Sequence, residues 1–240
     1  MNLQSALRIV YPPQCISCGA LTESDFGLCG ACWRDTPFIS GLVCETCGTP
    51  LLGDVTSHVV HCDDCMSIAR PWSRGRAVLL YRDNGRKIVL AIKHGDRTDL
   101  ARPAGTWLAA AAVPLIRTDT VIVPVPLHWT RLFRRRYNQS ALLAHWLGRA
   151  LGLPVCPDAL LRSRRTQSLG GQGREGRFAL MQGAVTPHPG RLSMIRGKSV
   201  LLVDDVMTSG ATLAACAEAA HAAGAAEVCV LLLARAAKDA

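Results

Sequence analysis

Aromatic residues, long apolar segments and a secretory signal are scarce or absent in this sequence. Aromatic residues make up 5% of the 240 residues, so few side chains are available to stack on nucleic-acid bases. The longest strongly apolar stretch without a charge, residues 103–116, spans 14 residues, whereas a membrane-spanning helix needs about 20. Residues 1–13 show no secretory signal. We therefore expect a cytoplasmic protein with no membrane span, and we interpret residues 103–116 as a core helix.

The positive charge of the chain is unevenly distributed. Its formal net charge is +9, but residues 1–72 carry three Arg against seven acidic residues, and residues 73–240 carry the whole basic excess. With 49% hydrophobic residues, the chain is long enough for one medium-sized α/β core and a small appendage that metal must stabilise. We expect two domains, residues 1–70 and 73–240. The field of the second attracts phosphates, either of a small substrate or of nucleic acid.

Eight of the 11 cysteines form four Cys-x-x-Cys pairs within residues 1–70. Each pair can present two thiolates to one zinc ion, and two pairs complete a tetrahedral site with no open position. The odd cysteine total and the expected reducing compartment argue against a disulfide framework. We predict two structural zinc ions. Sequential pairing is preferred, and interleaved pairing stays open. The eight predicted ligands are Cys15, Cys18, Cys29, Cys32, Cys44, Cys47, Cys62 and Cys65.

Residues 200–213 join an apolar strand, two carboxylates and a small-residue loop that leads into a helix. Asp204 and Asp205 would repel a bare phosphate, but they suit hydrogen bonds from two vicinal ribose hydroxyls, helped by a magnesium ion. The loop at Thr208, Ser209 and Gly210 is small enough to close on a 5′-phosphate at the positive end of the next helix. Acidic pairs at strand ends also occur in magnesium-dependent phosphotransfer and receiver domains. The full order of residues favours a ribose-phosphate site.

Strands and helices alternate along the second domain. Turn and cap signals predict strands at 76–81, 120–125 and 228–233, and helices at 85–94, 101–116 and 211–223. Asn138 is a plausible N-cap for a further helix that ends at Gly152. This pattern predicts an α/β fold, with a mainly parallel sheet flanked by helices.

Three further segments carry chemistry. Val125 and Pro126 end a predicted strand with a rigid backbone that could present amides to a pyrophosphate. Arginines follow at 131–136, and they either form a solvated helix end or hold pyrophosphate or a nucleic-acid backbone. Residues 162–177 mix arginine with glycine, which suggests either a cationic flap that closes over the reacting centre or an exposed loop. We assign Arg165 and Arg177 of this flap a catalytic role.

These motifs, taken in order, resemble the ComF family of competence proteins, which joins an N-terminal double zinc ribbon to a type I phosphoribosyltransferase-like domain. The resemblance implies binding of phosphoribosyl pyrophosphate (PRPP) with Mg²⁺. It also implies cytosolic handling of incoming single-stranded DNA, with a DNA-uptake helicase as partner. The family usually has Gly-Phe where this chain has Arg136 and Tyr137. The residues implied for the ribose are Asp204 and Asp205, for the phosphates Thr208, Ser209, Gly210, Ala211, Thr212, Val125, Pro126 and Lys93, and for nucleic acid Arg134, Arg135, Arg136 and Tyr137.

Two functions therefore stay open at the level of sequence. In the first, the chain is an enzyme that displaces pyrophosphate from C1′ of PRPP in favour of an acceptor that the sequence does not identify. In the second, it is a non-catalytic DNA-binding or ligand-sensing adaptor that keeps the phosphoribosyltransferase fold without turnover. Trp129, Phe133 and Tyr137 are the best candidates for base stacking, although such residues more often pack in a core.

Overall fold

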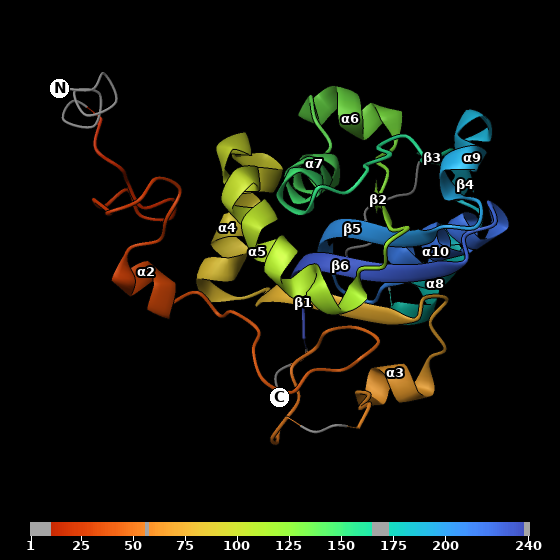
Figure 1. Cartoon of the computed structure of the whole chain (residues 1–240), viewed down its shortest axis with the longest axis horizontal. Coiled ribbons are helices and arrows are strands. Elements are labelled where there is room, and N and C mark those ends of the chain that lie inside the picture. Colours follow the sequence, from red (N-terminus) through yellow and green to blue (C-terminus); the bar gives the residue numbers. More distant parts are fainter. Residues whose placement is uncertain (1–10, 56–57, 165–172, 238–240) are drawn as a thin grey trace.

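A computed structural model describes residues 11–55, 58–164 and 173–237, and its centre is a parallel four-stranded sheet in the order β1-β6-β5-β2 (Figure 1). Each neighbouring pair of strands is parallel. The strands are almost continuously apolar because both faces of the sheet are covered. Their bounds are Arg74–Leu80 for β1, Val121–Pro124 for β2, Ser199–Met207 for β5 and Glu227–Arg235 for β6. The predicted α/β fold is confirmed.

Helices cover both faces of this sheet. On one face lie α4 (Asp83–His94), α5 (Ala101–Ala112) and α7 (Gln139–Leu151), and on the other lies α10 (Ala211–Ala222). Helix α7 begins after the predicted N-cap, since the Asn138 side chain accepts from the Ser140 N–H, and it ends at Gly152 in the left-handed conformation. The helix predicted over 101–116 is shorter. It ends at Ala112 and tightens into the 3-10 turn Val113–Leu115, which contains Pro114.

Smaller elements complete the α/β domain. A two-stranded antiparallel sheet pairs β3 (Leu160–Arg162) with β4 (Val185–Pro187). The segment between these strands includes α8 (Arg174–Met181), which contacts α10. The remaining helices are α6 (Trp129–Arg135), α9 (Leu192–Ile195), and the 3-10 turns Thr98–Leu100 and Pro189–Arg191. Among the helices of the described ranges, none has the length and apolarity needed to cross a bilayer.

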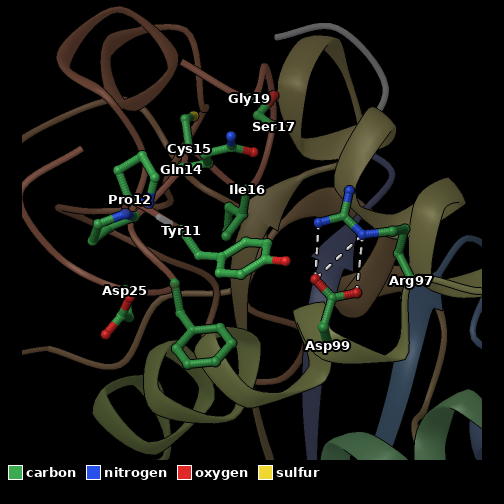
Figure 2. Close-up of a pocket in the computed structure, with 12 residues that line it drawn as sticks. Tyr11, Pro12, Gln14, Cys15, Ile16, Ser17, Gly19, Asp25, Arg97 and Asp99 are labelled. Carbon is green, nitrogen blue, oxygen red and sulfur yellow. Dashed lines mark hydrogen bonds and ion pairs between the residues drawn. The ribbon is translucent and has the colours of Figure 1, made fainter. Parts of the chain in front are cut away.

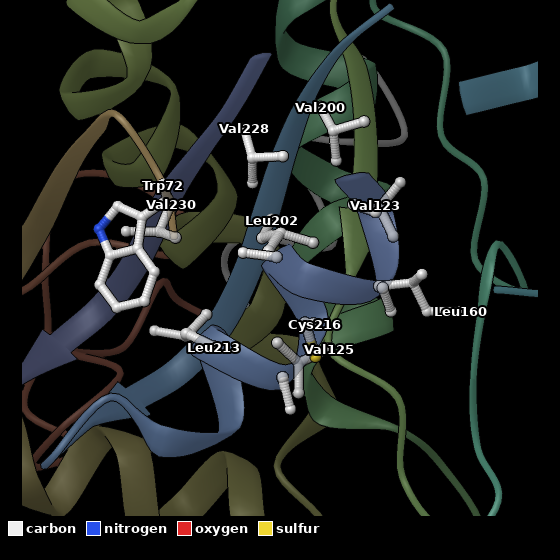
Figure 3. Packing of buried hydrophobic residues seen from close by; sticks show 14 of the residues in the cluster. Trp72, Val123, Val125, Leu160, Val200, Leu202, Leu213, Cys216, Val228 and Val230 are labelled. Atoms are coloured by element: carbon white, nitrogen blue, oxygen red, sulfur yellow. The ribbon is translucent and has the colours of Figure 1, made fainter. Parts of the chain in front are cut away.

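Alternating side chains of the central strands enter two separate cores. Val200 and Leu202 of β5 pack on the α10 side, where Figure 3 shows them beside Val228 and Leu213. Leu201, the residue between them, packs on the side of α4, α5 and α7. This two-residue alternation is the geometry of an extended strand. Burial of both faces fixes the register of the sheet, because a shift by one residue would exchange the two cores.

The N-terminal cysteine-rich segment covers the free edge of β1. Ile39 N–H donates to the Val78 carbonyl at 2.8 Å, and Leu80 N–H donates to the Pro37 carbonyl at 2.9 Å. Further along the strand, Gly75 N–H donates to the Glu45 carbonyl at 2.8 Å. These bonds satisfy backbone groups that an open sheet edge would expose. The segment therefore continues the backbone hydrogen bonding of the sheet beyond β1.

The two halves of this segment pack on opposite faces of the sheet. Ile16 lies in the core formed by α4, α5 and α7, with Leu28 and Phe38 packed against it. Cys44 and Cys47 lie in the α10 core and are fully buried there. The segment also contains the single-turn helices α2 (Gly30–Arg34) and α3 (Asp63–Ser67). The metal-binding region and the sheet thus share their hydrophobic cores.

Gly48 provides a test of this packing. Its φ is +67°, and a Cβ there would lie 2.6 Å from the Ala77 nitrogen and 2.8 Å from the Arg76 Cα. Gly41 has a similar φ of +77° but no atom within 4 Å of the corresponding Cβ position. We expect Gly41→Ala to lower the free energy of unfolding by about 1 kcal/mol through backbone strain alone. Gly48→Ala should lower it by about 2–4 kcal/mol, because β1 must also move.

Denaturant-induced unfolding of the zinc-loaded variants measures both changes. Equal losses of unfolding free energy in the two variants would mean that the cysteine-rich segment is not in tight contact with β1 at Gly48.

Candidate functional site

Eight cysteines form two groups of four, and each group consists of two pairs adjacent in sequence. The thiol sulfurs within a group lie within 4.8 Å of one another. Cys18 Sγ and Cys29 Sγ are 3.7 Å apart, and Cys47 Sγ and Cys62 Sγ are 3.6 Å apart. A tetrahedral site with Zn–S bonds of about 2.3 Å has sulfur–sulfur edges of about 3.8 Å. The spacing fits zinc and is far too long for a disulfide. We call Cys15, Cys18, Cys29 and Cys32 the first thiol group, and Cys44, Cys47, Cys62 and Cys65 the second.

In each thiol group, one cysteine has a lowered pKa, which favours its thiolate form. Hydrogen bonds from Cys44 and Cys65 lower the pKa of Cys47. In the first thiol group, burial raises the pKa of Cys15, but backbone N–H groups of Cys29 and Cys18 outweigh it and bring the pKa to about 6. Several sulfurs packed this closely cannot all ionise unless a cation lies among them. The chemistry of both groups therefore suits structural zinc.

The acidic pair lies at the carboxyl end of β5 and is almost fully buried, with exposed fractions of 8% for Asp204 and 4% for Asp205. Ser140 Oγ, on the first turn of α7, donates to Asp204 Oδ1 at 2.8 Å. Lys93 Nζ, on the last turn of α4, lies 3.0 Å from Asp205 Oδ2. That oxygen accepts no directed hydrogen bond from the described residues. Two helices thus hold the acids in place, and the Lys93 ammonium supplies the opposite charge beside Asp205 Oδ2.

Burial strongly perturbs one of these carboxyls. Desolvation, followed by the neighbouring charge of Asp205, raises the pKa of Asp204 to about 7, although the Ser140 hydroxyl and Lys93 oppose the shift. Further basic groups lie around the acidic pair. Burial and the charges of Arg135 and Lys93 lower the pKa of His94, which lies beside Lys93 on α4. A polyanionic ligand entering here would relieve this concentration of positive charge.

The loop after β5 has the geometry of a phosphate cradle. Gly210 adopts φ +84° as the N-cap of α10, and a Cβ there would lie 2.8 Å from Arg70 Nη1 and 2.9 Å from Met207 Cε. Within the described part of the chain, the N–H groups of Thr208, Ser209 and Gly210 have no hydrogen-bond acceptor. They precede the N-terminus of a twelve-residue helix, whose dipole favours an anion. Ala211 and Thr212 form the first turn of that helix.

The turn after β2 differs from the expectation for Val125 and Pro126. Val125 N–H donates to the Val203 carbonyl at 2.9 Å and so extends the pairing of β2 with β5. Pro126 has no N–H to offer. The amides of Leu127 and His128 come next, and neither has an acceptor among the described residues. Asn138 Nδ2 fixes the turn by donating to the Val125 carbonyl at 3.0 Å. The backbone N–H groups available to a pyrophosphate are therefore those of Leu127 and His128, two residues further along the chain than Val125 and Pro126.

Helix α6 carries Arg134 and Arg135, two of the four predicted nucleic-acid residues, and it exposes two aromatic rings. Trp129 is 71% exposed and Phe133 is 87% exposed. Arg134 and Arg136 are exposed, whereas Arg135 Nη1 donates to Gln139 Oε1 at 3.3 Å. We call the exposed side chains of Trp129, Phe133, Arg134 and Arg136 the α6 surface. Solvated aromatic rings between guanidinium groups are typical of single-strand binding surfaces.

Tyr137 and Arg136 differ from what the sequence led us to expect. The Tyr137 hydroxyl donates to the Ile92 carbonyl at 2.5 Å, so this ring anchors α4 and does not belong to the α6 surface. Arg136 adopts φ +66° as the C-cap of α6. Glycine is the residue that tolerates this conformation best, which explains why the resembling family usually places glycine there.

The flap is described in part. Arg165 lies outside the described residues. Arg177 lies on α8, and its predicted catalytic role stays a prediction. The neighbouring Phe178 ring lies 5.8 Å from the guanidinium of Arg70. Arg164 Nη2 donates to the carbonyls of Leu180 and Gln182, which ties the start of the flap to the end of α8.

Sequence reasoning missed Ser140, Arg70 and Arg235. Ser140 is 1% exposed and bonds Asp204, and the N-cap pattern at Asn138 was its only local signal. Arg70 Nη1 donates to the Ser209 carbonyl at 2.7 Å. Arg235 Nη1, at the end of β6, donates to the carbonyls of Met207 and Thr208 at 3.2 and 3.1 Å. We call residues 208–210 the phosphate loop. Both arginines hydrogen-bond to this loop or to the residue before it, although they lie far from it in the sequence.

A separate cavity of about 430 Å³ lies between residues 11–26 and the turn after α4 (Figure 2). The figure shows the Tyr11 ring next to the ion pair of Arg97 with Asp99, whose atoms approach to 2.8 Å. These two charges neutralise each other, and neither Asp204 nor Asp205 lines the cavity. The acidic pair and its loop are therefore the better candidate site.

Family models match both parts of the chain. The double zinc ribbon domain family matches residues 6–66, and the phosphoribosyl transferase domain family matches residues 140–240. The solved structure of a glutamine PRPP amidotransferase from B. subtilis covers 59% of this chain and 30% of its own, with 20% identity and a TM-score of 0.40. The chain is a phosphoribosyltransferase-type α/β protein with an N-terminal double zinc ribbon.

Full-length relatives identify the family. The DNA utilization protein YhgH of Escherichia coli (strain K12) is 30% identical over 234 residues, which cover 95% of this chain and 99% of the relative. Competence protein F of Haemophilus influenzae is 28% identical over 229 residues, which cover 93% of this chain and 97% of the relative. The chain belongs to the ComF family, as its sequence motifs predicted.

The raised pKa of Asp204 predicts a pH-dependent stability. An unfolded aspartate has a pKa of about 4, so ionising Asp204 destabilises the fold as pH rises from there towards 7, and the full penalty applies above 7. Asparagine keeps the oxygen that accepts from Ser140 but cannot ionise. We expect Asp204→Asn to raise Tm by about 2–6 °C at pH 8, and by roughly half as much at pH 5.5.

Thermal unfolding of the zinc-loaded protein at both pH values measures this change. Asp99→Asn is the control, because Arg97 lowers the pKa of Asp99 and the same substitution there should not stabilise the fold. A lower Tm for Asp204→Asn at pH 8 would show that the buried charge is compensated.

Proposed function

We propose that the chain binds PRPP with Mg²⁺ at the carboxyl end of β5 and acts on incoming single-stranded DNA in competence or DNA utilisation. The observation that carries the first part is the phosphate loop itself. Its unpartnered amides, the left-handed Gly210 and the N-terminus of α10 all lie directly after the buried acidic pair. The names of the relatives, DNA utilization protein and Competence protein F, support the second part.

Different residues of the site bind different parts of PRPP. Thr208, Ser209 and Gly210 offer amides to the 5′-phosphate, with Ala211 and Thr212 on the helix turn behind them. Asp204 and Asp205 accept hydrogen bonds from the two ribose hydroxyls. The amides at Leu127 and His128 are free to approach the pyrophosphate. Mg²⁺, when bound, would neutralise charge on the departing pyrophosphate.

In an enzyme of this kind, the bond from C1′ to the pyrophosphate oxygen breaks while a nucleophile attacks the opposite face of the ribose. The ribose acquires positive charge in that transition state, and the nearby carboxylates stabilise it. Arg177 and Arg165 of the flap would close over the reacting centre and exclude water. The chain's own part is therefore to hold both phosphoryl groups and to shield the sugar.

The α6 surface favours a second candidate function, a non-catalytic DNA-binding or ligand-sensing adaptor. Exposed Trp129 and Phe133 beside arginines suit unpaired bases and their phosphates. The surface follows directly on the turn at Leu127 and His128. In this function, PRPP occupies the same site without losing pyrophosphate, and a DNA-uptake helicase is the expected partner.

Calorimetric titration of the full chain with PRPP and Mg²⁺ tests the ligand. We expect saturable binding that weakens about 10- to 100-fold in Asp205→Asn, because a charged hydrogen-bond acceptor is lost. Asp99→Asn, the same change at the cavity of Figure 2, should bind like the wild type. Absence of binding to the wild type would refute the proposed ligand. Pyrophosphate release in the presence of single-stranded DNA or bases then favours the enzyme, and binding without release favours the adaptor.

The α6 surface makes a separate prediction about DNA. Phe133→Ala and Trp129→Ala should each weaken binding of an oligothymidine by about 1–3 kcal/mol. Arg134→Gln should reduce the slope of log affinity against log salt by about 0.7. Fluorescence anisotropy at several salt concentrations measures both changes. Tyr11→Ala, at a ring that is 77% exposed elsewhere, and Arg86→Gln, at an exposed arginine of α4, are the controls. Salt-independent affinity would exclude the arginines as phosphate contacts.

A further inference from the structure

The linker between the zinc ribbon and β1 reaches the phosphate loop. Arg70 Nη1 donates to the Ser209 carbonyl at 2.7 Å, and a Cβ on Gly210 would lie 2.8 Å from the same nitrogen. The Arg70 guanidinium lies 5.4 Å from the centroid of the Trp72 ring and 5.8 Å from that of Phe178 on α8. One side chain of the linker therefore contacts the loop, its own segment and the flap helix.

Trp72 connects this arrangement to the second thiol group. Its ring is 4% exposed, and its Nε1 donates to the carbonyl of Thr46 at 2.7 Å. Thr46 lies between Cys44 and Cys47, so the indole is bonded to the turn that carries two of the zinc ligands. The same ring packs in one core with Leu213 of α10, as Figure 3 shows. A continuous series of contacts thus runs from the second thiol group through Thr46, Trp72 and Arg70 to the loop.

Arg235 holds the same loop from the end of β6. It is 3% exposed, and its Nη1 donates to the carbonyls of Met207 and Thr208. A buried guanidinium restrains the carbonyls that it bonds, because its charge strengthens both hydrogen bonds.

The first thiol group makes no comparable contact with the loop in the described structure. Its neighbours lie on the opposite face of the sheet, where Ser17 Oγ donates to Asn84 Oδ1 at 2.5 Å and Asn84 Nδ2 donates to Thr36 Oγ1 at 2.6 Å. Ile16 packs there with α4 and α5. The two zinc sites therefore stabilise different parts of the molecule.

We propose that Arg70 is a positioning residue that joins the phosphate loop to the second thiol group through Trp72. The shape of the loop then depends on zinc at that group and not on zinc at the first. Arg70 also lies against Phe178, so that α8, the loop and the ribbon are joined at one guanidinium. The consequence for ligand affinity rests on the proposed function, whereas the ordering of the loop does not.

Hydrogen exchange of the amides at 214–217, measured by mass spectrometry on the full zinc-loaded chain without ligand, tests the ordering of the loop. These are the first hydrogen-bonded amides of α10, and the Ala214 N–H donates to the Gly210 carbonyl of the loop at 2.9 Å. In Arg70→Gln we expect exchange to be faster by about tenfold, as loss of one charge-assisted hydrogen bond predicts. Arg70→Lys should recover part of the protection, since it keeps the charge but not the planar fork. Arg191→Gln, at an arginine paired with Asp158 elsewhere, should leave these amides unchanged. Native mass spectrometry should show both zinc ions in all three variants.

A pair of cysteine variants tests the difference between the two metal sites. Cys62→Ser and Cys18→Ser should each weaken one zinc site, as native mass spectrometry reports. Only Cys62→Ser should speed exchange at 214–217. Equal effects of the two variants, or unchanged exchange in Arg70→Gln, would overturn the proposal. Titration of the same variants with PRPP and Mg²⁺ is a separate measurement. If the wild type does not bind PRPP, the proposed function fails while the exchange experiment still decides the role of Arg70.

Discussion

Burial of two adjacent carboxylates at the end of β5 is the constraint on which the site depends. Burial and the neighbouring charge of Asp205 both oppose the ionisation of Asp204. The fold tolerates this unfavourable pair because Ser140 and Lys93 reach it from two different helices. Buried like charges that are only partly compensated are typical of ligand sites, where the bound molecule supplies the missing hydrogen-bond donors.

The opposite face of the sheet supports the other half of the site. There, the phosphate loop lies between β5 and α10, and its carbonyls are held by Arg70 and Arg235. Among the described residues, the amides of Thr208, Ser209 and Gly210 have no acceptor, which suits an anion. A chain of this size could have closed the free edge of β1 with another strand. It closes the edge with the zinc ribbon, and the linker that leaves the ribbon at Arg70 meets the loop.

Local signals in the sequence predicted the elements and the motifs, but not how they meet. The helix from Asn138 to Gly152 and the strand of the acidic pair follow from caps, turn residues and apolar runs within each segment. The bonds of Ser140 to Asp204 and of Arg70 to Ser209 join residues 64 and 139 positions apart, so no local pattern encodes them. The availability of the amides after β2 is a similar case. Whether the Val125 N–H is free depends on how far β2 pairs with β5, and only the sheet register determines this.

The order of elements after β2 places two kinds of phosphate recognition side by side. The turn at Leu127 and His128 offers backbone amides, which bind a compact anion from close range. The next residues form the α6 surface, where long guanidinium side chains and exposed rings suit an extended and variable polymer. Tyr137 then fastens the end of this segment to α4, beside Lys93. The Tyr137 hydroxyl thus joins the segment that carries the α6 surface to the helix whose Lys93 pairs with Asp205.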